Sequence, residues 1–283
     1  MSDFKLKPKI KVEYDRRKLE FKFSNWDFDS HKKLTSRAFA TISGSNKWES
    51  AGKGILERFR MIEKEEIDPY YAVRGDIAEM LVYNFMKKHY KENKNIDIEL
   101  ATWDKEKINY DNFNNNKKFG GMIDIAIKSP ERYRAVIEVK SKSIKDLELI
   151  KKNRGNKEEI MQGLFLSYLS KVDKCLMTYV FFTPAQERLI KEAIRNDKNI
   201  GYPFNSKMLA KEVLNNIIWT YTKYDIIPFK HLVSNYEMDF LVKSGYEMLE
   251  NFKATHTIAE QNFSVNEVKY LISLATGEEE RPF

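Results

Sequence analysis

Apolar side chains recur at helical spacing in the first third of the chain. The segments 30–43 and 45–67 are each predicted as a helix, the first after a Ser30 cap and the second with an irregular start. Residues 68–92 (DPYYAVRGDIAEMLVYNFMKKHYKE) open with an aspartate cap and a first-turn proline, and keep helical spacing up to a lysine-rich end. Residues 1–29 have weak periodicity and are predicted as an N-terminal arm or as short strands.

Strand patterns occupy the middle of the chain. Residues 95–103 alternate between apolar and polar side chains, and the Asn-rich segment 109–121 is predicted as a loop. Two strands are then predicted at 122–128 and 135–140, joined by a turn that contains SPER. A buried strand is predicted at 174–183.

Helical patterns return in the second half. A helix is predicted at 157–169 and another after Pro184, and residues 203–275 are predicted as mainly helical with breaks near Pro228 and Gly245. This order of elements predicts an α/β (α+β) fold in which helices flank a central mixed β-sheet.

The length of 283 residues fits one enzyme-sized domain better than two independent ones. We therefore expect a single domain over residues 1–283. Its core would cover about 30–200, followed by the helical region 203–275 and an acidic tail at 276–283.

Composition narrows the class of protein only slightly. The net charge of +7 and the pI of about 9.1 suit a phosphate-rich partner, but they are also common in lysine-rich proteins. The longest apolar runs are far shorter than the roughly 20 residues of a membrane helix, and the N-terminus lacks the apolar core of a signal peptide. We expect a soluble protein of the cytoplasm with no membrane association. The single cysteine, Cys175, excludes a disulfide framework and a thiolate-held zinc or iron–sulfur site within one chain.

Three charged residues stand where the predicted strands should be apolar. Asp124 lies on an otherwise apolar strand face, and Glu138 and Lys140 project together from the next strand, roughly 7 Å apart. If the strands pair as a hairpin, Asp124 can reach Glu138, and two carboxylates that meet in this way need a cation such as Mg²⁺ between them. The alternative is an edge hairpin whose charges face solvent and form a surface salt bridge.

Two helices carry further candidates. Glu79 lies on a small and apolar helix face, where a carboxylate needs a partner. Gly75 lies one turn earlier and would let the helix approach the sheet closely, so that Glu79 reaches the metal; simple tolerance of a helical glycine is the alternative. Gln162 lies among apolar residues of its helix, either as a satisfied core amide or as a ligand for a water or a phosphate.

Basic residues gather directly after the predicted strand at 135–140. Residues 140–157 contain seven basic side chains and two acidic ones. A solvated surface is the ordinary explanation of such a run. Because the run begins at the acidic cluster, we expect it to hold a nucleic-acid backbone. The side chains concerned are Lys142, Lys145, Lys151, Lys152 and Arg154.

These residues resemble the PD-(D/E)xK nuclease superfamily, whose strand aspartate and following (D/E)-x-K match Asp124 and EVK at 138–140. Ile123 replaces the eponymous proline, which is not a ligand. The order RGDIAE, GGMIDIAI, IEVKSKS, a basic loop and EEIMQGLFLSYL is similar to the YqaJ-like recombinases, the family of phage lambda exonuclease, over about residues 30–185.

This resemblance implies a restriction-endonuclease-like core and roles for individual residues. The metal ligands would be Glu79, Asp124, Glu138 and the backbone carbonyl of Val139, with Lys140 as the catalytic lysine and Gln162 as the active-site glutamine. Ser36 and Arg37, in LTSRAFATIS, match the region near the 5′-phosphate less securely.

The function expected from the residues and the resemblance is a Mg²⁺-dependent deoxyribonuclease, with Mn²⁺ able to replace Mg²⁺. The resemblance implies a 5′-to-3′ exonuclease on double-stranded DNA ends that serves phage-type recombination in a bacterial or phage-infected cell. It also implies a trimer and a single-strand annealing protein as partner. Two alternatives stay open, namely a restriction-type endonuclease and an inactive nuclease fold that binds DNA or inhibits another protein.

Overall fold

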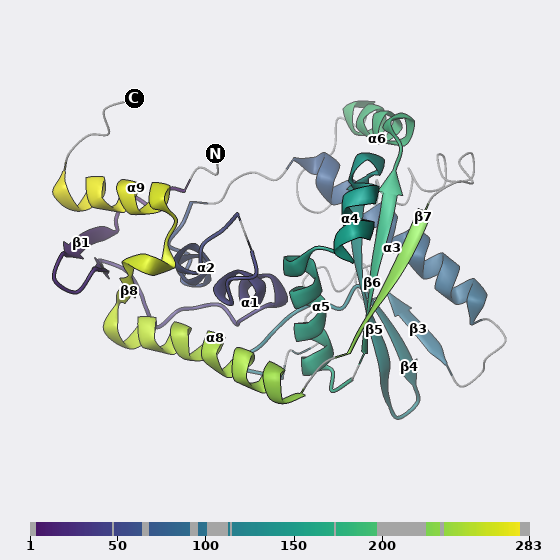
Figure 1. Cartoon of the computed structure of the whole chain (residues 1–283), viewed down its shortest axis with the longest axis horizontal. Helices are drawn as coiled ribbons and strands as arrows, with labels where there is room; N and C mark the ends of the chain where they lie inside the picture. The colour runs from purple at the N-terminus through teal and green to yellow at the C-terminus, as the bar shows by residue number, and fades with distance from the viewer. Residues whose placement is uncertain are drawn as a thin grey trace. The chain divides into compact units, whose positions relative to one another are not determined.

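In this computed structural model the chain forms two compact units (Figure 1). The structure describes residues 4–46, 48–63, 68–90, 96–100, 113, 115–172, 174–196, 225–232 and 235–277. Unit 1 comprises residues 1–65, 116–120 and 236–283, and unit 2 comprises residues 66–115 and 121–235. The predicted N-terminal arm therefore lies in unit 1, together with the last helices of the chain. That the chain acts as one nuclease domain stays a prediction.

Unit 1 contains a small antiparallel sheet and several helices. The sheet has the order β1-β2-β8. Its strands are β1 (Lys11–Asp15), β2 (Glu20–Ser24) and β8 (Thr257–Ala259). The helices are α1 (Ser36–Ile42), α2 (Ala51–Arg58), α8 (Asn235–Thr255), η4 (Glu260–Asn262) and α9 (Val265–Thr276). Edge-on aromatic contacts, such as Phe21 with Phe263 and Phe59 with Phe252, fill the space between sheet and helices.

The first two predicted helices begin later and are shorter than their sequence patterns indicated. The prediction of a helix from Ser30 is wrong in its start, because Leu34 forms a β-bridge with Phe119 and Thr35 occupies the N-cap position of α1. The helix predicted at 45–67 is reduced to α2, whose N-cap Ser50 accepts a hydrogen bond from the backbone N–H of Lys53. Residues 47 and 64–67 lie outside the described residues.

Unit 2 is built on a five-stranded sheet with the order β3-β4-β5-β6-β7. Only β5 and β6 are parallel; the other neighbours are antiparallel. The strands are β3 (Asp97–Leu100), β4 (Ile125–Ser129), β5 (Arg132–Ser143), β6 (Lys174–Phe182) and β7 (Asp225–Leu232). The helices are α3 (Pro69–His89), η2 (Ile144–Asp146), α4 (Leu147–Asn153), α5 (Lys157–Leu169) and α6 (Pro184–Asn196). The predicted mixed sheet flanked by helices is confirmed.

Helices cover both faces of this sheet. On one face, the apolar sides of α3 and α6 pack on Ile125, Ile137 and Val139. On the other, α4 and α5 pack on Ala126, Val136 and neighbouring residues of β6. The alternation of side chains along β5 therefore sends Glu138 and Lys140 toward the α5 side.

Caps explain which boundaries of unit 2 were predictable. Helix α3 has the predicted Asp68 cap, which accepts the backbone N–H of Tyr70, and the predicted helix 157–169 matches α5 with Asn156 as its cap. Strand β4 begins at residue 125 instead of 122, and the stretch predicted as a basic loop folds into η2 and α4.

The C-terminal region is mainly helical, with two corrections. Gly245 does not break a helix, because α8 continues through it, and Pro228 lies within β7 instead of interrupting a helix. Because β7 is an edge strand, a proline that donates no hydrogen bond is tolerated there. Residues 203–224 lie outside the described residues. None of the helices that the structure describes combines the length and the apolar character needed to cross a membrane.

Candidate active site

The candidate site lies where β4 begins beside β5. Ile125 of β4 pairs with Ile137, so Asp124 immediately before β4 comes opposite Glu138. The backbone N–H of Val139 donates a hydrogen bond of 2.7 Å to Asp124 Oδ2. The Asp124 carboxylate thus takes the place of a strand residue as the partner of β5. The N–H and the carbonyl of one strand residue point to the same edge of the strand, so the Val139 carbonyl faces this carboxylate side too.

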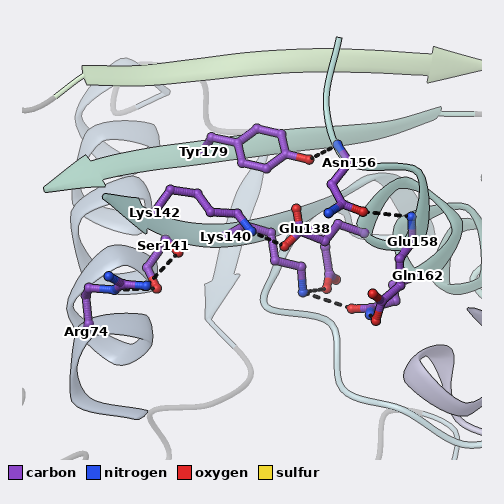
Figure 2. A network of polar contacts seen from close by, with 10 residues as sticks. Arg74, Glu138, Lys140, Ser141, Lys142, Asn156, Glu158, Gln162 and Tyr179 are labelled. Atoms are coloured by element: carbon purple, nitrogen blue, oxygen red, sulfur yellow. Dashed lines mark hydrogen bonds and ion pairs between the residues drawn. The ribbon is translucent and has the colours of Figure 1, made fainter. Parts of the chain in front are cut away.

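Lys140 links the sheet to α5 at this point (Figure 2). Its Nζ donates to Glu138 Oε1 at 2.6 Å and to Gln162 Oε1 at 2.9 Å, while Gln162 Nε2 donates to Glu158 Oε1 at 3.2 Å. The Glu138 side chain is only 6% exposed, and its Oε2 atom has no hydrogen-bond partner within the described part of the chain. The structure therefore brings Asp124, Glu138, Lys140 and Gln162 together, as the sequence predicted.

Negatively charged side chains lie close together in the cluster, and their repulsion shifts pKa values there. Burial, together with repulsion from Glu138 and Glu79, holds the pKa of Asp124 well above its ordinary value, against the opposing effects of Lys140 and the Val139 N–H. Burial alone would lower the pKa of Lys140, but attraction to Glu138 and Asp124 outweighs it and the pKa is raised. Lys140 therefore carries its positive charge at neutral pH.

Glu79 is half-buried on α3, and its charge contributes to the raised pKa of Asp124. The explanation offered for Gly75 is wrong, because a Cβ atom built there would meet nothing within 4 Å. Close helix–sheet approach occurs instead at Gly163 of α5, where a Cβ would stand 2.6 Å from Cys175 Sγ and 2.7 Å from Met177 Sδ.

The donor set suits a hard divalent cation. Among the described residues, no three acidic, histidine or cysteine side chains already form a cluster that could hold a metal ion. However, the unpartnered buried oxygen of Glu138 and the mutual repulsion of Asp124, Glu138 and Glu79 are what such a cation would relieve. Carboxylate and backbone carbonyl oxygens are ligands of the kind that Mg²⁺ takes. The residues therefore fit a Mg²⁺ ion.

A second ion pair borders the cluster. Lys142 Nζ donates to Glu159 Oε1 at 2.7 Å, and the buried Glu159 Oε2 has no hydrogen-bond partner among the residues that the structure describes. The backbone N–H of Asn156 donates to the hydroxyl of Tyr179 at 2.9 Å, which fixes the start of α5 to β6. Sequence reasoning did not single out Glu159, since an acidic residue in the first turn of a helix is ordinary.

The remaining basic candidates are presented by α4 and the residues around it. Lys145, Lys151, Lys152 and Arg154 are exposed, and Lys151 lies 3.8 Å from Glu148. Arg154 ends the helix in a left-handed conformation with φ of 55°. The structure thus gathers these four cations on one short helical segment that follows β5 directly.

Ser36 and Arg37 lie at the start of α1 in unit 1. Arg37 is exposed, and its Nη2 lies 3.4 Å from Glu49 Oε1. Their relation to the cluster in unit 2 stays a prediction.

Sequence reasoning also missed Arg74. Arg74 of α3 is 11% exposed and contacts Ser141, the residue after Lys140 (Figure 2). The sequence does not distinguish an arginine in the second turn of an amphipathic helix from an arginine exposed to solvent. The one sequence feature of Arg74 is its position, directly before Gly75 and five residues before Glu79.

Comparison with solved structures finds two exonucleases that match this chain. A phage-related exonuclease from Haemophilus somnus 129PT is 15% identical, with a TM-score of 0.47, over 79% of this chain and 94% of its own. An alkaline exonuclease from Laribacter hongkongensis is 12% identical, with a TM-score of 0.41, over 87% of this chain and 95% of its own. No protein-family model and no curated protein matches. Identities and TM-scores this low carry no function over to this chain.

Proposed function

We propose that this protein is a Mg²⁺-dependent deoxyribonuclease that hydrolyses phosphodiester bonds at the cluster around Lys140. The observation that supports this most strongly is the pairing of two crowded carboxylates, Asp124 and Glu138, with an ammonium group held 2.6 Å from Glu138 and 2.9 Å from Gln162. Burying these charges together costs free energy of folding. Catalysis on an anionic substrate explains why the protein holds them together.

Mg²⁺ would be held by Glu79, Asp124, Glu138 and the carbonyl of Val139. When bound, it supplies Lewis-acid polarisation of a phosphate oxygen and a water of lowered pKa. Asp124 and Glu138 contribute the negative charge that attracts the ion, while the Val139 N–H keeps the Asp124 carboxylate oriented.

Lys140 orients the attacking water and stabilises the negative charge that develops on the phosphate. Its raised pKa favours these roles over proton abstraction, because the ammonium stays charged at neutral pH. Gln162 holds the ammonium from the α5 side, and its own amide is tied to Glu158. Of the two roles left open for Gln162, that of a satisfied amide which positions Lys140 is the one that these contacts support.

The substrate that we propose is the end of double-stranded DNA, degraded from 5′ to 3′ during phage-type recombination. The exposed cations Lys145, Lys151, Lys152 and Arg154 would hold the phosphate backbone. Ser36 and Arg37 would contact the 5′-phosphate, and a trimer and a single-strand annealing partner are further parts of this proposal.

The test is digestion of a linear duplex that carries a label at one 5′ end, with Mg²⁺ or with EDTA. The proposal predicts Mg²⁺-dependent release of short labelled products from the 5′ end, and faster release when that end carries a phosphate. The same sequence as a covalently closed circle is the control. Efficient cutting of the circle would identify an endonuclease, and DNA binding without digestion in either Mg²⁺ or Mn²⁺ would identify an inactive nuclease fold.

A further inference from the structure

Arg74 on α3 contacts two other elements, β5 and α6, as well as residues of its own helix. Its Nε donates to Ser141 Oγ and its Nη2 donates to the carbonyl of Ser141, each at 3.3 Å. Its Nη1 donates to the hydroxyl of Tyr70 at 3.2 Å and lies 3.3 Å from Glu187 Oε1 of α6. The guanidinium also lies over the rings of Tyr70 and Tyr71. A guanidinium presents its donors in a rigid plane. This set of contacts therefore fixes the orientation of Ser141 relative to Arg74 as well as the distance between them.

The hydrogen bond from Arg74 to the Ser141 carbonyl takes the place of a hydrogen bond from a neighbouring strand. Strand β4 begins at Ile125 opposite Ile137, whereas β5 continues to Ser143. Beyond Ile137, no strand of the described residues lies beside the edge of β5 that faced β4, and the backbone groups there need other partners. The Val139 N–H donates a hydrogen bond to Asp124, and the Ser141 carbonyl accepts one from Arg74.

Lys140 lies between these two anchored residues. The two side chains that anchor them belong to different elements, since Asp124 precedes β4 and Arg74 is on α3. If the Arg74 anchor were removed, Asp124 would be the one described side chain still holding this edge of the strand, and the direction of Lys140 and of the Val139 carbonyl would be less defined.

We propose that Arg74 is a positioning residue, which holds the end of β5 so that Lys140 and the Val139 carbonyl keep the geometry needed for hydrolysis. This inference rests on the proposed nuclease function. Arg74 does not itself bind DNA, because its side chain is 11% exposed and its donors are engaged with Ser141, Tyr70 and Glu187.

The experiment compares wild type, Arg74→Met, Arg74→Lys and the control Arg195→Met, which removes an exposed charge of α6. Three quantities are measured on each full-length protein. They are kcat for Mg²⁺-dependent digestion of linear duplex DNA, the Kd for the same DNA in EDTA, and amide hydrogen exchange of residues 139–143 without metal or DNA. Thermal unfolding identifies a variant that has lost its fold, in which case Arg74→Lys supplies the comparison.

For Arg74→Met we expect kcat to fall by about 10- to 100-fold with Kd within about 2-fold of wild type, as a misplaced catalytic group predicts. Exchange in 139–143 should accelerate by about 10-fold, while that of β6 stays unchanged. Arg74→Lys should recover part of kcat, since an ammonium reaches one acceptor but not both Ser141 atoms and Glu187 together. Arg195→Met should match wild type.

Two results would overturn the inference. One is unchanged exchange at 139–143 in Arg74→Met, and the other is a loss of digestion that comes entirely from weaker DNA binding. If wild type digests no DNA at all, the proposed function fails, but the exchange data still decide whether Arg74 orders the end of β5.

Discussion

In the metal-free protein the ionisation of Asp124 costs free energy, because burial and the charges of Glu138 and Glu79 raise its pKa. A carboxyl group whose pKa is higher in the folded state than in the unfolded state binds its proton more tightly when folded. Its contribution to stability is therefore present at low pH and is lost as the pH rises from the unfolded pKa through the folded one. Above the raised pKa of Asp124 this loss is complete, unless a cation is bound beside the carboxylate.

Asp124→Asn should therefore be more stable than wild type in EDTA at pH 7, although it should digest no DNA. The amide keeps an oxygen for the Val139 N–H and removes the repulsion with Glu138. The Tm difference should shrink as the pH falls through the raised pKa of Asp124. Thermal unfolding across this pH range measures it, with the exposed Asp239→Asn as control. An equal or lower Tm for Asp124→Asn at pH 7 would show that the carboxylates do not repel each other as described.

Local geometry made part of the site predictable. The alternation of side chains in a strand placed Glu138 and Lys140 on one face, and a hairpin then brought Asp124 to them. Arg74 could not be predicted in this way, because Ser141 and Glu187 are 67 and 113 residues away in the sequence. Its role depends on how α3 and α6 pack on the sheet.

Helix α5 approaches the sheet more closely than any side chain larger than glycine would allow at Gly163. Gly163→Ala should therefore destabilise the protein by about 1 to 3 kcal/mol, because a methyl group must displace buried sulfur atoms of β6. It should also slow digestion, since Gln162 would move with the helix.

Gly75→Ala is the matched control on α3, where nothing lies within 4 Å of the added atom. It should raise the free energy of unfolding by about 0.5 to 1 kcal/mol, as alanine does in a helix interior. Chemical denaturation of both variants measures the difference. If both variants changed the free energy of unfolding in the same direction, the packing described for Gly163 and Gly75 would be contradicted.

Helix α4 presents the cations that we propose hold DNA. Replacement of Lys152 and Arg154 by Gln should weaken DNA binding about equally for all sequences, and should lower the slope of log Kd against log salt by about two. The control replaces Arg188 and Arg195 of α6, which are also exposed, and should leave the slope unchanged. Equal effects of the two double variants would point to a general charge effect in place of a binding surface.

Elements with strong end signals were predicted well, and others were not. Helix α3 begins after the predicted Asp68 cap, and α5 covers the predicted residues 157–169. Helix α4 was missed because a short lysine-rich segment resembles a solvated loop. The start of β4 was misplaced because Asp124 binds β5 through its side chain, which ends regular pairing there.

The whole molecule consists of two units assembled from segments far apart in the sequence. The mixed sheet and its helices in unit 2 were predictable, since each element has its own period and consecutive elements are close in space. Unit 1 was not, because its sheet joins β2 to β8 across more than 200 residues, which no local pattern encodes.

The central claim is that Mg²⁺-dependent DNA hydrolysis occurs at the cluster around Lys140, and one comparison tests it most directly. Wild type and Lys140→Met are each given linear duplex DNA with Mg²⁺, and the rate of nucleotide release is measured beside the Kd for DNA in EDTA. The exposed α9 variant Lys269→Met is the control. We predict a loss of rate of about 100-fold or more for Lys140→Met, with Kd nearly unchanged, as for a group that acts on the reacting atoms. Digestion by Lys140→Met at the wild-type rate would contradict the account.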